Sequence, residues 1–163
     1  MLRNILCYSG RKTGLIGTIT HQIGEEEYSP VNTTPGKDLL RTYFDKMDSK
    51  HMDCCVIEAS SHGLVQGRLD DTEISYGAFT NLTQDHLDYH VTMENYLRAK
   101  AKLFDMAPIA AVNGDDPACA YLMEHTSSKK LRFSAKTAEA DLWAERIDHH
   151  SSSGVAFDAV TAS

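Results

Sequence analysis

The chain has 163 residues, of which 42% are hydrophobic and 24% charged, and its formal net charge is −7 at pH 7. This length and composition predict one soluble globular domain that is large enough to bury a core. The acidic balance argues against a general nucleic-acid binder or a protein that binds anionic membranes, so we expect neither nucleic acid nor membrane among its partners.

The first twenty residues contain neither a signal core nor a membrane span, because Arg3, Arg11 and Lys12 interrupt them. We therefore expect no secretory segment. The four cysteines of the chain include no CxxC pair. Together these features predict reduced thiols and a cytoplasmic protein.

The segment SGRKTG (9–14) resembles the end of a phosphate-binding loop, but its context is reversed. Arg11 stands between Gly10 and Lys12, and no earlier glycine lies at the required distance. A phosphate loop follows a strand and opens a helix. This segment instead follows a helical pattern and precedes an apolar run, so we interpret it as a helix-to-strand turn with Gly10 at the end of the helix.

Four apolar runs along the chain are predicted to be buried strands. They cover residues 13–19, 52–59, 76–82 and 109–114. The runs are continuous rather than alternating, which is typical of a parallel sheet that is covered on both faces.

Helical patterns fall between these runs. They cover residues 35–47, 93–104 and 117–125. Thr34 is the expected cap of the first helix, with Pro35 as its first residue, and Thr92 is the expected cap of the second. The alternation of strands and helices predicts an α/β fold with a mostly parallel, doubly wound sheet flanked by helices.

The end of the chain differs from the rest. After LRFSA (131–135), residues 141–163 are predicted to form two strands joined by a polar turn at 151–154, which makes a β-hairpin attached to the main sheet. We divide the chain into residues 1–140, the main α/β part, and residues 141–163, the start of a hairpin extension of the same domain. Because the sequence stops within AFDAVTAS, we expect a truncated domain.

The stretch NLTQDHLDYH (81–90) gathers four potential ligands or acid–base groups. These are Asp85, His86, Asp88 and His90. The stretch alone is compatible with a metal site, a catalytic cluster or a polar loop. A metal-dependent hydrolase built on these residues is the weakest functional hypothesis, because such enzymes usually carry several matched His and carboxylate ligands at defined spacings.

Lys100 occupies an unusual position in the predicted helix that follows. Spacings of three and four residues place it among Tyr96, Leu97 and Phe104 on the apolar stripe, whereas Lys102 falls on the polar side. An inward lysine loses hydration unless it is paired or chemically altered. Lys100 either extends to the edge of the stripe or is a functional lysine near the His86 loop.

Four motifs, in the same order, resemble the central, ATP-binding domain of the Mur ligases, with the MurE-type ligases as the best match. The motifs are NTTPG (32–36), EASSHGLVQGRL (58–69), TNLTQDHLDYHVTMENYLRAKAKLF (80–104) and VNGDDP (112–117). Each is short, but four in register make the resemblance specific, and it covers most of residues 13–143. Residues 1–140 then correspond to part of that central domain.

The resemblance implies an ATP- and Mg²⁺-dependent ligase of peptidoglycan synthesis. Such an enzyme phosphorylates a carboxylate of UDP-N-acetylmuramoyl-L-alanyl-D-glutamate, and the amine of a diamino acid (meso-diaminopimelate or L-lysine) then attacks the acyl phosphate. The matched positions imply substrate contacts at Thr33, Thr34, Ser60, Gln66 and Arg68, magnesium ligands at Glu58 and His86, a carbamate on Lys100 that also binds the metal, and a nucleotide contact at Asn113.

Several implied residues also have ordinary structural explanations. Glu58 at a strand end is equally suited to an ion pair, Ser60 to a helix cap and Asn113 to a turn. The phosphate loop and both flanking domains of the Mur ligases have no counterpart in this sequence, so we expect the isolated chain to be inactive. The alternative function is a non-catalytic module that binds a nucleotide-sugar or a partner.

Overall fold

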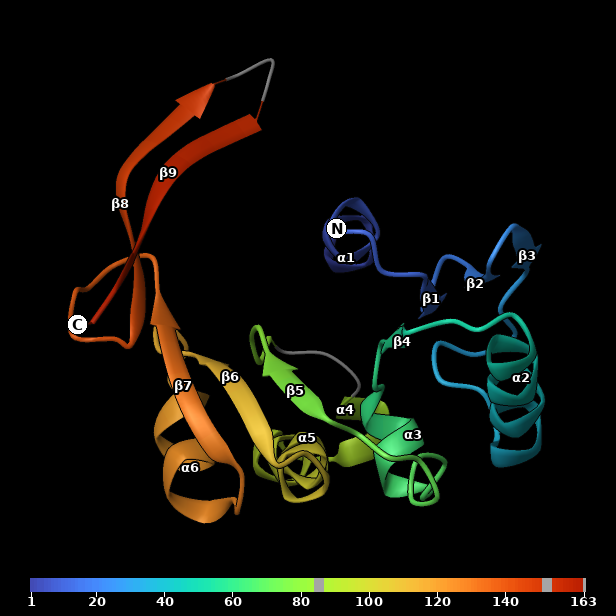
Figure 1. Ribbon diagram of the computed structural model, residues 1–163. Coiled ribbons are helices and arrows are strands. Elements are labelled where there is room, and N and C mark those ends of the chain that lie inside the picture. The colour runs from blue at the N-terminus through green and yellow to red at the C-terminus, as the bar shows by residue number, and fades with distance from the viewer. Residues whose placement is uncertain (84–86, 151–153, 163) are drawn as a thin grey trace. The chain divides into compact units, whose positions relative to one another are not determined.

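The computed structural model describes residues 1–83, 87–150 and 154–162. The chain divides into two compact units, Met1–Thr72 (unit 1) and Glu73–Ser163 (unit 2). The predicted α/β class, with mostly parallel strands flanked by helices, is confirmed. The strands are divided between two sheets, one in each unit (Figure 1).

Unit 1 contains a four-stranded sheet in the order β3-β2-β1-β4. Its elements are α1 (Leu2–Tyr8), β1 (Thr13–Ile16), β2 (His21–Ile23), β3 (Glu26–Tyr28), α2 (Lys37–Ser49), β4 (Cys54–Ile57) and α3 (Ser61–Val65). The strands β1 and β4 are parallel, whereas β2 is antiparallel to both of its neighbours. The turn between α1 and β1 confirms the interpretation of SGRKTG: Gly10 follows the end of α1 with a φ of +88°.

The β2–β3 hairpin of unit 1 was not predicted. The strand expected over 13–19 ends at Ile16, because the chain turns at Gly17, whose N–H donates to the Thr20 carbonyl. The hairpin itself turns at Gly24, which has a φ of +65°. Glycine adopts this left-handed conformation at little energetic cost. Gly24 is therefore the residue in the sequence that indicates a turn at this position.

The helix α2 begins later than predicted, which corrects the expected roles of Thr34 and Pro35. Its N-cap is Gly36, and its first residue is Lys37. The Thr34 side chain does not cap the helix because its hydroxyl donates to the Glu58 carbonyl, 2.8 Å away. The free N–H groups at the start of α2 therefore belong to residues that follow Thr33 and Thr34, not to these two threonines.

Unit 2 contains a five-stranded sheet in the order β5-β6-β7-β8-β9, with only the last pair antiparallel. Its elements are β5 (Tyr76–Phe79), α4 (Leu87–His90), α5 (Met93–Met106), β6 (Ile109–Asn113), α6 (Ala118–His125), β7 (Lys129–Ser134), β8 (Leu142–His150) and β9 (Gly154–Thr161). Thr92 caps α5 as predicted, accepting from the Asn95 N–H at 3.1 Å.

The core of unit 2 lies between the sheet and the helices α5 and α6 (Figure 1). Phe79 of β5, Phe104 of α5 and Val112 of β6 are each 3% exposed or less. Burial alternates along β5, where Tyr76 is 74% exposed. The expectation that both faces of the strands are covered is therefore wrong for β5, since the helices that contact it cover one face.

The predicted C-terminal hairpin is formed by β8 and β9, which pair from Leu142↔Thr161 to His150↔Gly154. Its register shifts between Glu145 and Asp148. Because β8 also pairs with β7, the hairpin extends the sheet of unit 2. Residues 151–153 of the predicted turn lie outside the described residues. Within the described ranges, no helix is long and apolar enough to cross a bilayer.

The stability of unit 1 is expected to depend on pH through His21, which is 1% exposed and lies 3.4 Å from the Tyr43 hydroxyl. Burial lowers the pKa of His21 below its usual value of 6.5, and the Asn32 backbone opposes this effect only in part. The unfolded chain therefore binds a proton before the folded unit does. The resulting stability is complete above about pH 6.5 and is lost as the pH falls through the folded pKa.

This prediction is tested by urea unfolding between pH 5 and 8, followed through amide resonances of unit 1. The wild type should lose stability below about pH 6.5. His21→Phe, which keeps an aromatic ring, should flatten that part of the profile. Exposed His51 provides the control, and His51→Asn should retain the wild-type slope. An unchanged slope in His21→Phe would assign the pH dependence to another group.

Candidate functional site

The Glu58 carboxylate follows the end of β4 and is held by the turn after β1. Its Oε2 accepts from the Thr18 N–H at 3.0 Å and from the Thr18 hydroxyl at 2.8 Å. The same hydroxyl lies 3.0 Å from the Thr33 hydroxyl. Gly17 permits this approach, because a Cβ at that position would lie 3.3 Å from Oε2. Thr18 thus joins a predicted metal ligand to a predicted substrate contact.

Thr34 is a fully buried residue that connects the NTTPG loop to the end of β4. Its hydroxyl donates to the Glu58 carbonyl at 2.8 Å and accepts from the Ser60 N–H at 2.9 Å. Ser60 in turn caps α3 by accepting from the Gly63 N–H at 3.1 Å. A Cβ at Gly63 would come within 2.8 Å of Thr34, so this close packing requires glycine. The Thr34 side chain is therefore committed to structure.

Gln66 and Arg68, two of the predicted substrate contacts, are in direct contact. The Arg68 Nε and Nη2 both donate to the Gln66 Oε1, at 3.0 and 2.6 Å. The Arg68 Nη1 donates to the Thr34 carbonyl at 2.5 Å. A guanidinium has five N–H donors, so two remain for a ligand. Arg68 thus fixes the loop after α3 against the Thr33–Thr34 segment.

Unit 1 therefore assembles Thr33, Thr34, Glu58, Ser60, Gln66 and Arg68 around the end of β4. Sequence reasoning missed Thr18, which is the hydrogen-bonding link between two of them. Thr18 lies in the predicted strand 13–19, where its side chain had no expected role. The signal available in the sequence was Gly17, whose missing side chain leaves space for the carboxylate.

Lys100 of unit 2 is half-buried on α5, while Lys102 is exposed, as the helical spacing predicted. The Lys100 Nζ lies 5.0 Å from the centroid of the Tyr96 ring, and His90 stacks on the same ring at 5.0 Å. A cation over an aromatic face is attracted to it by the ring quadrupole. His86 and Asp85 lie outside the described residues, so their predicted roles stay predictions.

Asn113 ends β6 and organises the turn that follows it. Its Nδ2 donates to the Thr80 carbonyl at 2.7 Å, and its Oδ1 accepts from the Asp115 N–H at 2.9 Å. Asp115 accepts from the Ser134 hydroxyl and from the Ala135 N–H, and these bonds hold the pKa of its carboxyl below the usual value. These two bonds leave the Asn113 amide one N–H donor and one lone pair.

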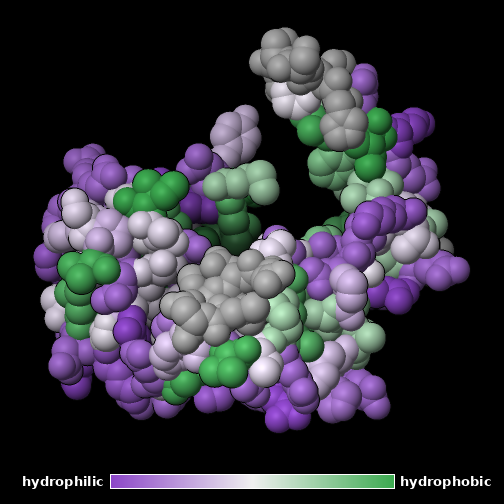
Figure 2. All heavy atoms as spheres, turned by 180° about the vertical axis from the view of Figure 1, so that it is seen from behind, coloured by the Kyte–Doolittle hydropathy of each residue, from purple (hydrophilic) through white to green (hydrophobic). Residues whose placement is uncertain are grey.

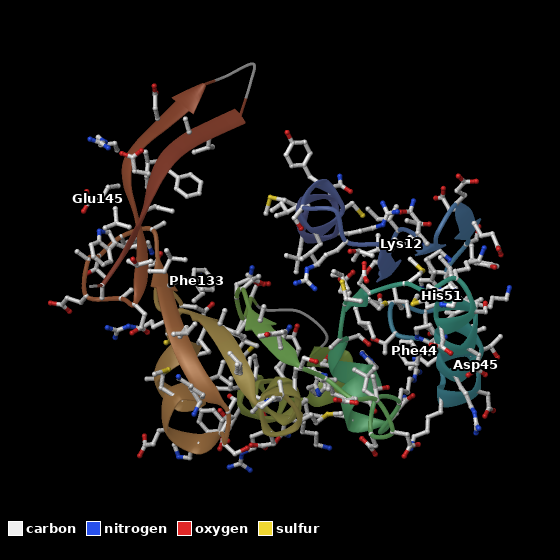
Figure 3. The ribbon with its side chains drawn as sticks, in the orientation of Figure 1. Lys12, Phe44, Asp45, His51, Phe133 and Glu145 are labelled. Atoms are coloured by element: carbon white, nitrogen blue, oxygen red, sulfur yellow. The ribbon has the colours of Figure 1, made fainter. Side chains whose placement is uncertain are left out.

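A cavity of about 650 Å³ adjoins Asn113 within unit 2. Its apolar lining includes Phe133, Leu142, Ile147 and Phe157, and Lys136 also lines it. Phe133 lies near the end of β7, at the base of the hairpin (Figure 3). Figure 2 shows hydrophobic residues along the hairpin arm at the upper right. The volume falls in the range of small-molecule sites.

The described residues contain no group of three or more His, Cys, Asp and Glu side chains arranged to hold a metal ion. Magnesium typically takes one or two protein carboxylates and completes its shell with phosphates and water. Glu58 fits that requirement because it is exposed and its Oε1 makes no hydrogen bond or ion pair with the described part of the chain. Unmodified Lys100 does not fit, since its ammonium would repel the ion.

The model of the Mur ligase middle domain matches residues 1–162. The chain belongs to the Mur ligase middle-domain family. The UDP-N-acetylmuramoyl-L-alanyl-D-glutamate–2,6-diaminopimelate ligases of Bacillus velezensis and Bacillus licheniformis are 40% and 41% identical to it over 170 aligned positions. The ligase of the same name from Chlamydia trachomatis is 39% identical over 163 positions. The alignments cover 97–99% of this middle domain but only 33–34% of each ligase.

Solved structures give the same assignment. A structure of UDP-N-acetylmuramoyl-L-alanyl-D-glutamate–2,6-diaminopimelate ligase superposes with a TM-score of 0.83 and 28% identity, covering 98% of this chain and 34% of that one. A variant of L. casei FPGS superposes with a TM-score of 0.65 at 15% identity, covering 98% of this chain and 46% of that one. The second likeness concerns the fold alone. The predicted family and fold class are confirmed.

Proposed function

We propose that this middle domain supplies the substrate- and metal-binding part of a MurE-type ligase. That enzyme adds a diamino acid to UDP-N-acetylmuramoyl-L-alanyl-D-glutamate at the expense of ATP. The observation that carries the proposal is the convergence of the family-matched positions of unit 1 on the end of β4. Ligands of α/β sheets bind outside the carboxyl ends of parallel strands, and Glu58 stands at that end of β4.

Unit 1 would hold the muramoyl-dipeptide. Thr33 is part-exposed beside Glu58, Ser60 lies at the start of α3, and Arg68 retains two N–H donors. An arginine fork recognises carboxylate and phosphate oxygens in two-point contacts. Because Thr34 is fully buried and its hydroxyl already makes two bonds, it would hold the Thr33 segment in place rather than touch the substrate itself.

Unit 2 would supply the nucleotide and carbamate functions. Asn113 and the adjoining cavity offer an amide and an apolar wall to the base of ATP. A carbamate on Lys100 would replace a cation with an anion that carries hard oxygens, and His86 is the other metal ligand that we propose in unit 2. Bound Mg²⁺ would stabilise the charge on the transferred phosphoryl group. The named relatives are 2,6-diaminopimelate ligases, and we propose diaminopimelate rather than L-lysine as the diamino acid for this protein.

Titration of the ¹⁵N-labelled chain with UDP-N-acetylmuramoyl-L-alanyl-D-glutamate and Mg²⁺ tests this assignment. We expect saturable amide shifts at residues 33–34 and 58–68. Arg68→Ala should weaken binding, whereas Arg41→Ala, at an exposed position of α2, should not. The assignment would be contradicted if the ligand bound without shifting the amide resonances of residues 33–34 and 58–68. It would also be contradicted if Arg68→Ala bound the ligand as tightly as the wild type.

A further inference from the structure

The three hydrogen bonds of Thr18 fix the direction of a short chain of hydroxyl groups. Thr18 contacts Glu58 Oε2 through both its N–H and its hydroxyl, and the same hydroxyl oxygen lies 3.0 Å from that of Thr33. A hydroxyl has one hydrogen to donate and two lone pairs, and an ionised carboxylate only accepts. The hydrogen of Thr18 is therefore used on Glu58, so Thr33 must donate its own hydrogen to Thr18.

This direction determines what Thr33 can offer to a ligand. Its hydrogen is committed to Thr18, so the exposed part of its hydroxyl presents a lone pair. A lone pair attracts an N–H or O–H group and repels an anionic oxygen. Thr33 would therefore recognise a hydrogen-bond donor, although it lies in a segment predicted to contact an anionic substrate.

We propose that Thr18 is a positioning residue that orients Glu58 and sets Thr33 as a hydrogen-bond acceptor. If the proposed function holds, Thr33 accepts a hydrogen bond from an amide N–H or a sugar hydroxyl of the muramoyl-dipeptide. It does not contact the diphosphate, whose oxygens are acceptors only. Thr18 also holds Oε2 of Glu58, which leaves Oε1 as the carboxylate oxygen that would be available to a metal ion. Thr18 itself touches neither substrate nor metal in this scheme.

The positioning role is tested without any ligand, through the side-chain carboxyl ¹³C resonance of Glu58, assigned with Glu58→Gln. Thr18→Ser keeps the hydroxyl and should leave the resonance in place. Thr18→Val keeps the shape and the N–H bond but removes the hydroxyl, and it should move the resonance while unit 2 amide shifts stay unchanged. The control is Thr42→Val, which removes a hydroxyl bonded to the Asp38 carbonyl of α2. An unmoved Glu58 resonance in Thr18→Val would overturn the inference.

The acceptor role of Thr33 is tested by binding. Thr33→Val should weaken the affinity for UDP-N-acetylmuramoyl-L-alanyl-D-glutamate roughly fivefold, the usual worth of one net hydrogen bond, while the affinity for UDP should not change. Thr33→Ser should restore binding. An equal loss for UDP would place Thr33 on the diphosphate region and overturn this part. If the wild type binds no muramoyl-dipeptide, the proposed function fails, and the Glu58 resonance still decides the role of Thr18.

Discussion

Phe104→Ala is expected to destabilise unit 2 by about 3–5 kcal/mol, the usual cost of truncating a buried phenylalanine. Phe104 is 1% exposed at the centre of the core, and its ring packs edge-on against Phe79, with centroids 6.4 Å apart. The backbone of β5 also packs against this ring, since a Cβ at Gly77 would lie 3.4 Å from it. Because the surrounding residues are closely packed, they can move only slightly into the space that the truncated side chain leaves.

Urea unfolding followed by the fluorescence of Trp143, the one tryptophan of the chain, measures this loss within unit 2. Met123→Ala on α6 serves as the matched control, because Met123 is 41% exposed and its truncation should change stability by about 0.5 kcal/mol or less. A Phe104→Ala variant as stable as Met123→Ala would show that α5 does not anchor the unit 2 core.

Glu58→Gln is expected to reduce ligation by roughly 100-fold or more, the scale found when a preorganised electrostatic group is removed from an active site. The amide keeps the size of the side chain and can still accept from Thr18, but it loses the charge that would attract Mg²⁺. The assay uses a chimaeric ligase in which this chain replaces the matched third of the Bacillus licheniformis enzyme.

The control for that experiment is Asp53→Asn in the same chimaera. The Asp53 carboxylate accepts from the Lys12 N–H at 2.7 Å and lies before β4, whereas Glu58 lies after it. We expect this variant to retain most of the activity. A Glu58→Gln chimaera with the same turnover as the unmutated chimaera would remove Glu58 from the metal site.

The sequence predicted the long, regular elements because their signals are local. Helix α5 combines a Thr92 cap with a clear apolar stripe, and β6 is a continuous apolar run between polar turns. The β2–β3 hairpin was missed because each strand has three residues, which is too short for a periodic pattern. The start of α2 was misplaced because Thr34, a good cap by type, makes a long-range bond to Glu58 instead.

The candidate site was predictable only as a set of positions. Motif resemblance placed Thr33, Glu58 and Arg68 in one ligand-binding region, and the structure brings these three together in unit 1. Their hydrogen-bond partners depend on contacts between segments 15–40 residues apart, which no local pattern encodes. For that reason the link through Thr18 and the contact of Arg68 with the Thr34 carbonyl could be found only in three dimensions.

The most direct test of the proposed function is the activity of the unmutated chimaera. The matched third of this chimaera is the present chain, and all other parts come from the Bacillus licheniformis ligase. Incubation with ATP, Mg²⁺, UDP-N-acetylmuramoyl-L-alanyl-D-glutamate and meso-diaminopimelate should yield the UDP-N-acetylmuramoyl-tripeptide, ADP and inorganic phosphate, and the tripeptide is detected by mass spectrometry. A folded chimaera that binds ATP but forms no tripeptide would contradict the assignment of this chain to a working MurE-type ligase.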